Sequence, residues 1–393
     1  MTSDTVTAFY DEHPYPPPVT DLTEYAARWS DGKLRRVEHH RMWPSAPRRE
    51  DPSILVAGCG TSQAAKYALR YPEGRVVGID VSQTSIDHTR RLAQRHGLDN
   101  LELQVMPISA TADLGASFDH IVCTGVLHHL TDPDAGIGAL RDLLTPEGAI
   151  YLMVYATYGR TGVYMIQEYC RRLEIGTGPA EIGDLVATLR EIPFGHPLSH
   201  LFRDTPDFRQ PDALADALLH PRDRSYSVPE VFELLGGAGL QLGRWVRQAP
   251  YLPTCGSVAS TPHGERIAAL PREAQYAALE LFRGTMTRHS LIAHRDDSPP
   301  PMSRLSFTRS GCAHYVPVRP STVIALEERL PEGAAAALLN KAHEFTDLVL
   351  FVNEAEKAMF EAIDGTRTIG QIGRDQPDFF RRLYEHDLIV IDA

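Results

Sequence analysis

The feature that most constrains this chain is a short apolar stretch, Ile54 to Ala57, that runs directly into the turn Gly58-Cys59-Gly60. Four apolar residues, two of them β-branched, predict a buried strand, and the glycines then let the backbone turn sharply into a helix. Main-chain N–H groups at such a helix start can approach a nucleotide-like ligand closely, because no side chain obstructs them. The same turn also occurs where a strand simply connects tightly to a helix.

Strand and helix patterns alternate through the middle of the chain, which predicts a parallel sheet. The predicted strands span residues 53–57, 75–80, 101–105, 120–123 and 149–154. The predicted helices span residues 61–70, 82–96 and 134–144. The alternation resumes with a helix capped by Ser227, a strand at 240–247, a helix at 272–282 and a strand at 289–294. The predicted fold class is therefore α/β, a doubly wound, Rossmann-like sheet.

The chain has 393 residues, more than the roughly 250–300 beyond which single cores usually divide. We predict a main domain over residues 51–295 with a helical cap inserted at about 155–225, whose helices span 164–173, 180–190 and 211–219. A charged, proline-rich linker at 296–304 precedes a small C-terminal module at 305–393. For this module the patterns predict a winged-helix-like α+β fold with strands at 314–318, 348–352 and 388–391 and helices at 335–344, 354–363 and 378–383.

Residues 1–50 form a separate N-terminal region. The segment from Phe9 to Pro18 interleaves aromatic residues with four prolines, which forbid a continuing helix and favour an extended path. This strap is predicted either to lay Tyr10, His13 and Tyr15 over a ligand or to pack as an arm on the surface. An amphipathic pattern then predicts a helix from Leu22 to Met42.

Composition excludes several classes of protein. A net charge of −12 argues against a nucleic-acid partner, and the basic residues between Gly32 and Glu50 fit a solvated helix face. The five cysteines are widely spaced, so neither a disulfide framework nor a metal site is predicted. The start of the sequence lacks a secretory pattern, and no apolar run reaches the ~20 residues of a membrane span. We expect a soluble, cytoplasmic protein without a membrane partner; the oligomeric state is not predicted.

An acidic residue follows the glycine turn at an informative distance. Asp80 lies twenty residues after Gly60, at the end of the second predicted strand. Nicotinamide or flavin dinucleotides and S-adenosylmethionine are both held by an acid at this place, because one carboxylate can accept hydrogen bonds from two ribose hydroxyls. Capping of the next helix is the structural alternative for Asp80, although Ser82 already suits that role. A dinucleotide site needs a third glycine where this chain has Gln63, which favours S-adenosylmethionine and disfavours an oxidoreductase.

From Ile54 to Val154 the sequence resembles the class I S-adenosylmethionine-dependent methyltransferases. The resemblance rests on the glycine turn, the Val76–Asp80 strand, the stretch Phe118–Ala135 and the stretch Leu140–Ala149. It implies cofactor contacts from Gly58, Cys59, Gly60, Thr61, Gln63, Asp80, Val81, Ser82, Met106, Pro107, Ile108, Thr124, Gly125 and Val126. Two positions depart from the family pattern: Val56 stands where an acid is common and Ser62 where a glycine is common. We therefore expect strap residues to help hold the methionine end of the cofactor.

Methyl transfer from a sulfonium is an in-line displacement that needs little beyond geometry. If the acceptor must lose a proton, His128, His129 or His13 are the candidate bases, and the alternative for the histidine pair is packing in the loop after the strand. Candidate substrate contacts are Tyr155, Tyr158 and Arg160, which leave the fifth predicted strand and enter the cap; simple cap-to-core packing is equally open for each.

These features predict methyl transfer to a nitrogen or oxygen of a small metabolite or natural product. A second interpretation is transfer to a peptide or protein side chain presented by the C-terminal module. A third is a regulatory protein that binds the cofactor without turnover. Aminopropyl transfer from a decarboxylated cofactor is a minor option.

Overall fold

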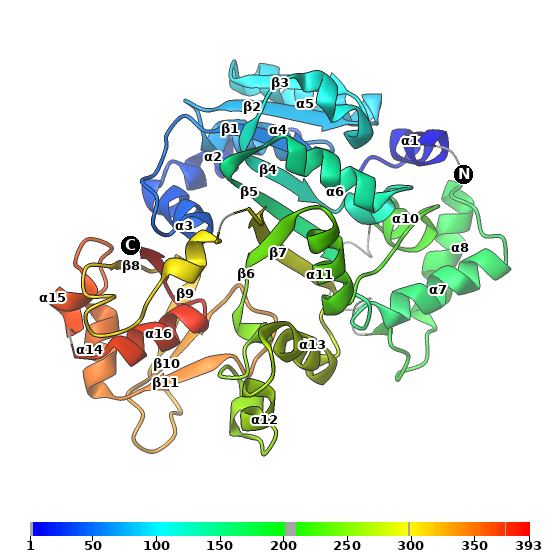
Figure 1. Ribbon diagram of the computed structural model, residues 1–393. Helices are drawn as coiled ribbons and strands as arrows, with labels where there is room; N and C mark the ends of the chain where they lie inside the picture. Colours follow the sequence, from blue (N-terminus) through cyan, green and yellow to red (C-terminus); the bar gives the residue numbers. More distant parts are fainter. Residues whose placement is uncertain (1–2, 200, 202–209, 298, 374) are drawn as a thin grey trace. The chain divides into compact units, whose positions relative to one another are not determined.

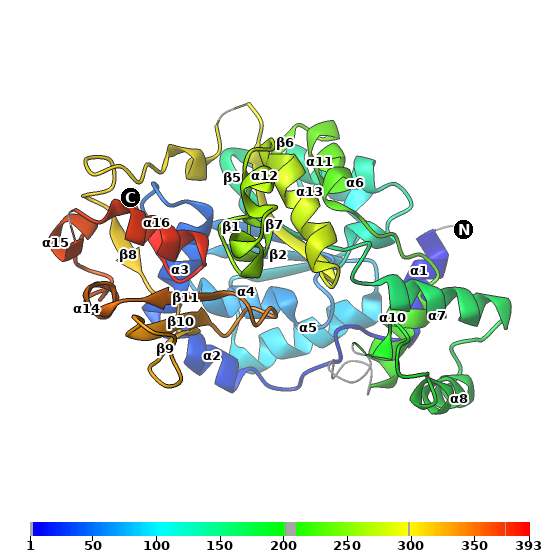
Figure 2. The ribbon, with the colours of Figure 1, turned by 90° about the horizontal axis from the view of Figure 1, so that it is seen from below.

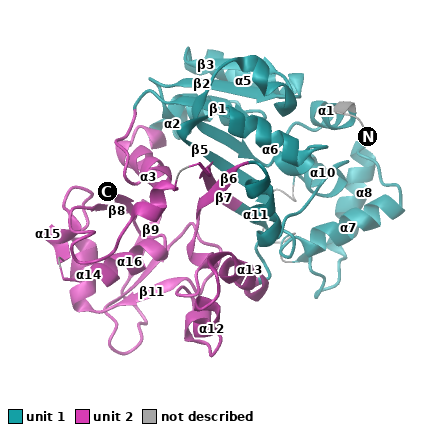
Figure 3. Ribbon diagram, in the orientation of Figure 1, with its two compact units in different colours: residues 1–27, 50–238, 284–289 teal, residues 28–49, 239–283, 290–393 magenta. Residues whose placement is uncertain are grey.

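The computed structural model describes residues 3–199, 201, 210–297, 299–373 and 375–393 (Figure 1). Residues 200 and 202–209 of the predicted cap and residue 298 of the predicted linker lie outside this described part. The chain forms two compact units (Figure 3). Unit 1 comprises residues 1–27, 50–238 and 284–289, and unit 2 comprises residues 28–49, 239–283 and 290–393. The domain boundaries expected from the sequence stay a prediction.

Unit 1 is built on five parallel strands in the order β3-β2-β1-β4-β5. Their bounds are β1 Ser53–Ala57, β2 Arg75–Asp80, β3 Leu101–Val105, β4 Phe118–Thr124 and β5 Leu144–Tyr155. The order reverses between β1 and β4, and ligands of open α/β sheets bind at the carboxyl ends of the strands beside such a reversal. The predicted doubly wound fold is confirmed.

Helices cover both faces of these strands (Figure 2). One face carries α4 Gln63–Arg70 and α5 Gln83–His96, and the other carries α6 Pro133–Asp142 and α11 Val228–Gly237. Both predicted N-caps are confirmed, because the Ser82 hydroxyl accepts from the Ser85 N–H at 3.1 Å and Ser227 forms a capping box with Glu230. The core between the layers includes Ile54, Val56 and Val122, each fully buried.

The predicted cap helices are confirmed as α7 Thr161–Arg172, α8 Pro179–Arg190 and α10 Pro211–Leu219. They share an apolar cluster that includes Val163, Leu185 and Leu214, and Phe9 from the N-terminal segment joins it. The chain returns from the cap beside β5, where the Tyr226 N–H donates to the Tyr155 carbonyl at 2.9 Å. The cap therefore has its own core and is tied to the end of a sheet strand.

The N-terminal region corrects two expectations. Residues Phe9 to Glu12 belong to a helix, α1 Ser3–Glu12, and the proline-rich part that follows bends at Tyr15 and Pro16, so the expected extended path is wrong for the start of the strap. The helix predicted over 22–42 is two helices, α2 Thr23–Trp29 and α3 Gly32–Met42. The break falls at Asp31, whose carboxylate accepts from the Lys33 N–H at 2.8 Å and starts α3, because an Asp side chain competes well as an N-cap.

In unit 2, strand β6 Leu240–Trp245 pairs antiparallel with β7 Arg288–Arg295 through residues 291–295. Two helices, α12 Gly264–Ala268 and α13 Arg272–Arg283, lie between them in sequence. The C-terminal part contains a three-stranded antiparallel sheet, β11-β10-β9, and a two-stranded pair, β12-β8. These elements are β8 Val316–Val318, β9 Val323–Leu326, β10 Ala336–Asn340, β11 Val349–Val352, α14 Glu354–Glu361, α15 Ile369–Gly373, α16 Pro377–Glu385 and β12 Val390–Asp392.

The helix predicted over 335–344 is wrong, because this segment is strand β10. Its alanine and leucine content favours a helix in isolation. Ala337 and Leu338 are instead buried in the middle strand of the three-stranded sheet, where each is paired with both neighbouring strands. Tertiary pairing therefore overrides local propensity here.

Two polar clusters lie within unit 2, one buried around Asp387 and one partly exposed around Asp392. Asp387 accepts from Arg244 Nη2 at 2.7 Å and from the Ala249 N–H at 3.0 Å. Asp392 accepts from Arg36 Nη2 at 2.6 Å and lies 3.3 Å from Nε2 of His40. These contacts fasten α3 and β6 to the C-terminal strands and helices of the same unit. Among the described residues, no helix is long and apolar enough to span a membrane.

Candidate active site

The glycine turn after β1 has the geometry that its sequence predicts. Gly58 and Gly60 have φ values of +70° and +53°, and the N–H groups of Gly58 and Cys59 both donate to the Ile79 carbonyl at 2.9 Å. A Cβ on Gly58 would lie 2.3 Å from Cγ2 of Val126, so the turn requires glycine and contacts the loop after β4. Cys59 is fully buried, and burial raises the pKa of its thiol, which makes it a packing residue rather than a nucleophile.

Asp80 completes this turn from the end of β2. Its Oδ2 accepts from the Gly60 N–H at 2.8 Å, and its Oδ1 accepts from the Ser82 N–H at 2.9 Å. Burial raises the pKa of Asp80 despite these hydrogen bonds, which favour the charged form. The Val81 N–H also hydrogen-bonds this carboxylate. Because a carboxylate has about four acceptor positions, room for a ribose hydroxyl is left. Asp80 and the turn are therefore one preorganised unit, and Ser82, not Asp80, caps α5.

The other predicted cofactor residues surround the same strand ends. Met106 donates its N–H to the Asp80 carbonyl at 2.9 Å, and Val81 lies between Asp80 and the cap of α5. Pro107 begins a 3-10 helix, η1 Ile108–Leu114, in which Ile108 is buried. Across the turn, Gln63 Nε2 donates to Thr124 Oγ1 at 2.7 Å, and Gly125 follows with φ +77°.

The N-terminal strap crosses the glycine turn. The Thr61 hydroxyl donates to the Pro16 carbonyl at 2.7 Å, and a Cβ on Gly60 would lie 2.9 Å from the Tyr15 carbonyl oxygen. In α1, Asp11 accepts from the Ser82 hydroxyl at 2.6 Å. These contacts place the strap directly beside the predicted cofactor residues; its function as a lid stays a prediction.

On the acceptor side, β4 ends in a short 3-10 helix, η2 Leu127–His129, which buries His128 and His129. The ring of Tyr155 lies 4.0 Å from that of His128, and the Arg160 guanidinium lies 3.6 Å from the Tyr155 ring centroid. The structure thus brings four of the predicted residues together. Tyr158 is 41% exposed and is not part of this group.

The strap residues Tyr10 and His13 lie at different distances from the histidine pair His128 and His129. Tyr10 is close to the pair, with its ring 6.3 Å from that of His129. His13, one turn further along, contacts Asp212 of α10 through Nδ1 at 3.1 Å. His13 therefore connects the strap to the cap, whereas His128 and His129 lie at the end of the sheet.

Three residues of this group were not predicted: Asp216, His220 and Asp223, all from α10 or the segment after it. The His220 ring lies 3.8 Å from that of His129, tilted by 37°, and Asp216 accepts from the Tyr10 hydroxyl at 3.0 Å. Asp223 pairs with Arg160 at 3.2 Å. A polar His-Pro-Arg-Asp run directly after a cap helix was the only sequence signal for them.

Burial sets the charge of this cluster. It lowers the pKa of His128 well below the usual value, that of His129 to about 4 and that of His220 to about 3. All three imidazoles are therefore neutral at pH 7 and less basic than an exposed histidine. Hydrogen bonds fix two tautomers: His129 Nδ1 donates to the Arg222 carbonyl at 2.7 Å, and His220 Nδ1 accepts from the Arg222 N–H at 3.1 Å. His129 Nε2 consequently carries a lone pair, and His220 Nε2 carries a proton.

A glycine turn at the first strand, an acid at the end of the second and a buried polar cluster at the ends of the fourth and fifth define a nucleotide-cofactor enzyme of the α/β class. A family model described as "Methyltransferase domain" matches residues 55–150. An uncharacterized protein of Synechococcus sp. is 30% identical over 305 residues, covering 75% of this chain and 72% of that protein.

Two further comparisons also find methyltransferases or the same fold. The ubiquinone biosynthesis O-methyltransferase of Brucella anthropi is 32% identical over 119 residues, 30% of this chain and 46% of that enzyme, so the match spans less than half of the enzyme. The structure of PKMT2 from Rickettsia typhi in complex with AdoHcy superposes with a TM-score of 0.63 at 15% identity, covering 95% of this chain and 75% of that one; it shows the same fold.

The chain belongs to the S-adenosylmethionine-dependent methyltransferase family and is an S-adenosylmethionine-dependent methyltransferase. The predicted family and cofactor are confirmed. The residues fit the cofactor, because the turn leaves no room for a side chain at Gly58 and Asp80 retains free lone pairs at the partly exposed end of β2. Which of the predicted residues contact it stays a prediction.

Proposed function

We propose that this enzyme transfers the methyl group of S-adenosylmethionine to an oxygen or nitrogen of a small metabolite. The observation that carries the proposal is the burial of the polar cluster at the ends of β4 and β5. His128 is 0% exposed, His129 4%, Asp216 3% and Arg160 8%. Such groups are kept out of water only where they serve a small, enclosed ligand or each other.

The cofactor supplies a methyl group on an activated leaving group, so the protein's task is positioning. Asp80 and the glycine turn hold the nucleoside end at the carboxyl ends of β1 and β2. His220 Nε2–H is a donor for an acceptor oxygen, and the lone pair on His129 Nε2 faces the same cluster. Tyr10 links α1 to the cap through Asp216, which helps to exclude water.

Two observations support a small substrate over a polymer. The net charge of −12 disfavours nucleic acid. The curated relatives include O-methyltransferases of ubiquinone biosynthesis, which match this chain over 119 residues in the example from Brucella anthropi. Their particular acceptors are not assigned to this chain, because the match covers only 30% of it.

The test is a transfer assay with methyl-labelled S-adenosylmethionine, the full chain and a cell extract separated into low-molecular-weight and polypeptide fractions. Label in a low-molecular-weight product, reduced in the His220→Ala variant and unchanged in the variant His263→Gln of an exposed histidine, is the expected result. Label only on polypeptides would replace the proposal with side-chain methylation. Cofactor binding without any labelled product would favour the regulatory interpretation.

A further inference from the structure

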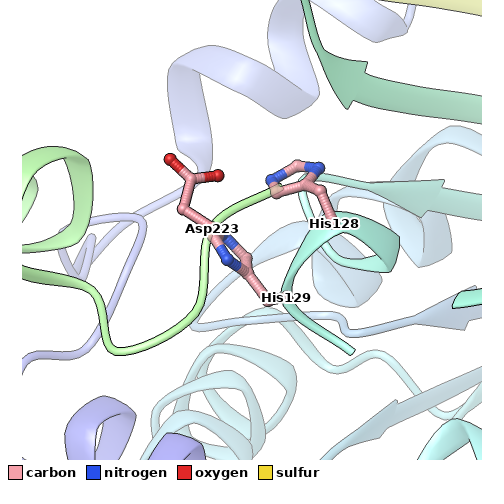
Figure 4. Close-up of side chains that lie close together, drawn as sticks. All are labelled: His128, His129 and Asp223. Atoms are coloured by element: carbon pink, nitrogen blue, oxygen red, sulfur yellow. The ribbon is translucent and has the colours of Figure 1, made fainter. Parts of the chain in front are cut away.

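We propose that His128, His129 and Asp223 bind a divalent first-row transition-metal ion. The sequence predicted no metal, since the ligands come from two distant segments. Figure 4 shows the three side chains gathered at the end of β4. Each offers one ligand atom, and these atoms all lie within 4.8 Å of one another. Zinc bonds to nitrogen and oxygen are roughly 2.0–2.2 Å long, so small side-chain rotations would close the set around one ion.

The strongest sign of a missing partner is unused hydrogen-bonding capacity. Both ring nitrogens of His128 and Oδ1 of Asp223 are buried without a hydrogen-bond partner among the described residues. The side chain of Asp223 is only 2% exposed. A buried polar atom without a partner destabilises the folded chain, so a bound ion at these atoms would remove that cost.

Hydrogen bonds to the other atoms of His129 and Asp223 orient the two ligand atoms, as hydrogen bonds to metal ligands do in known metal sites. His129 donates Nδ1–H to the Arg222 carbonyl, which leaves Nε2 as a lone pair. Oδ2 of Asp223 accepts from Arg160 Nη2 at 3.2 Å and Gln167 Nε2 at 2.8 Å, which leaves Oδ1 free. The Arg224 N–H donates to the His128 carbonyl at 3.1 Å and keeps the two ligand segments together.

A second set, His129, Asp216 and His220, also converges within 4.8 Å. It is the weaker metal site. The Arg222 N–H occupies the Nδ1 lone pair of His220, so Nε2 is protonated and cannot bind a cation unless that hydrogen bond breaks. Asp216 already accepts from Tyr10. Asp216 and His220 suit hydrogen bonding to a substrate beside the ion.

Two imidazoles and one carboxylate form a donor set used for catalytic zinc and for non-haem iron, and three protein ligands leave open positions. The role of the ion rests on the proposed function: it would hold a hydroxyl oxygen of the acceptor and make its proton more acidic. The O–H electron pair then forms the new O–C bond, the S–C pair returns to sulfur, and the proton passes to bulk water. The His129 lone pair holds the ion in this arrangement and takes no proton.

The test is a titration of the chelator-stripped full-length enzyme with Co²⁺, followed by visible d–d absorption, with Zn²⁺ as competitor. We expect one equivalent of Co²⁺ that Zn²⁺ displaces. Changing residues that only hydrogen-bond to metal ligands weakens metal sites about 10–100-fold, so His128→Gln and Asp223→Asn, which remove ligands, are expected to weaken binding at least 100-fold, roughly. His263→Gln is the matched control and should leave it unchanged. S-adenosylhomocysteine binding by each variant checks that it is folded.

The outcomes separate the site from its role. Equal Co²⁺ binding by wild type, His128→Gln and Asp223→Asn, or no binding by wild type, would overturn the site. One bound ion together with undiminished methyl transfer by the stripped enzyme would overturn the role while leaving the site. Failure of the proposed function is seen independently, as absence of any labelled small product from both metal-loaded and stripped enzyme.

Discussion

Replacing Asp80 by Asn tests whether Asp80 and the glycine turn bind the cofactor together, because the change keeps the shape of the side chain and removes its charge. The carboxylate accepts backbone N–H groups on both oxygens, from Gly60 and Ser82. The amide of Asn can accept only one of them, so the free energy of unfolding should fall by about 1–3 kcal/mol. A lost charge-assisted bond to a ribose hydroxyl is worth about 1.5–3 kcal/mol, which corresponds to roughly 10–150-fold weaker binding of S-adenosylhomocysteine.

Calorimetric titration with S-adenosylhomocysteine and thermal unfolding without ligand measure the two effects separately. Asp87→Asn on α5 is the matched control, since that half-exposed carboxylate pairs with Arg90 and should affect neither quantity strongly. Burial raises the pKa of Asp80, so wild-type affinity should fall on acidification earlier than for an exposed Asp, and Asp80→Asn should remove this dependence. An Asp80→Asn affinity indistinguishable from wild type would refute the ribose assignment.

Three further perturbations follow from buried contacts. Burial lowers the pKa of His40 to about 4, so the contribution of neutral His40 to stability is complete above pH 6.5 and is lost as the pH falls to about 4. In that range the free energy of unfolding should fall by about 1.4 kcal/mol per pH unit. Urea unfolding of His40→Gln at several pH values should lack this dependence. Asp387→Asn leaves the Arg244 guanidinium buried and unpaired and should lower the unfolding free energy by about 3–5 kcal/mol in the same assay; a change below 1 kcal/mol, roughly, would contradict the buried-pair interpretation. Tyr10→Phe removes a donor to the cap and should raise the KM for the methyl acceptor, whereas Tyr158→Phe at the surface should not; equal effects in steady-state kinetics would contradict this placement.

The cofactor side of the site was predictable because its determinants are local. A turn glycine and an acid at the next strand end are fixed by strand length and crossover geometry, so Gly60 and Asp80 meet as the spacing of twenty residues predicted. Helix caps such as Ser82 are equally local. The sequence therefore sufficed for the parallel strands and for the cradle at their carboxyl ends.

The acceptor side was only half predictable, because it depends on long-range packing. His129 contacts a segment ninety-three residues away, and no pattern in α10 or in the segment after it shows that Asp216 and Asp223 turn inward. Local propensity also gave the wrong secondary structure for β10, where pairing with two neighbouring strands decides the conformation. The strap was a related case: aromatic and proline content identified the segment, but not the helix that brings Tyr10 to the histidines.

One departure from the family pattern, Val56, leads to a prediction about the strap. Val56 is fully buried in the sheet and offers nothing polar to the methionine end of the cofactor. The carbonyls of Tyr15 and Pro16 lie over the turn instead, and carbonyl oxygens with a spare lone pair can accept from an ammonium group. Thr61 anchors this segment by one hydrogen bond, so Thr61→Val should weaken S-adenosylhomocysteine binding about 2–10-fold, the equivalent of roughly 0.5–1.5 kcal/mol. Methylthioadenosine, which lacks the amino-acid end, should bind both forms alike; an equal loss for both ligands would show that Thr61 supports the turn and that the strap carbonyls do not replace the missing acid.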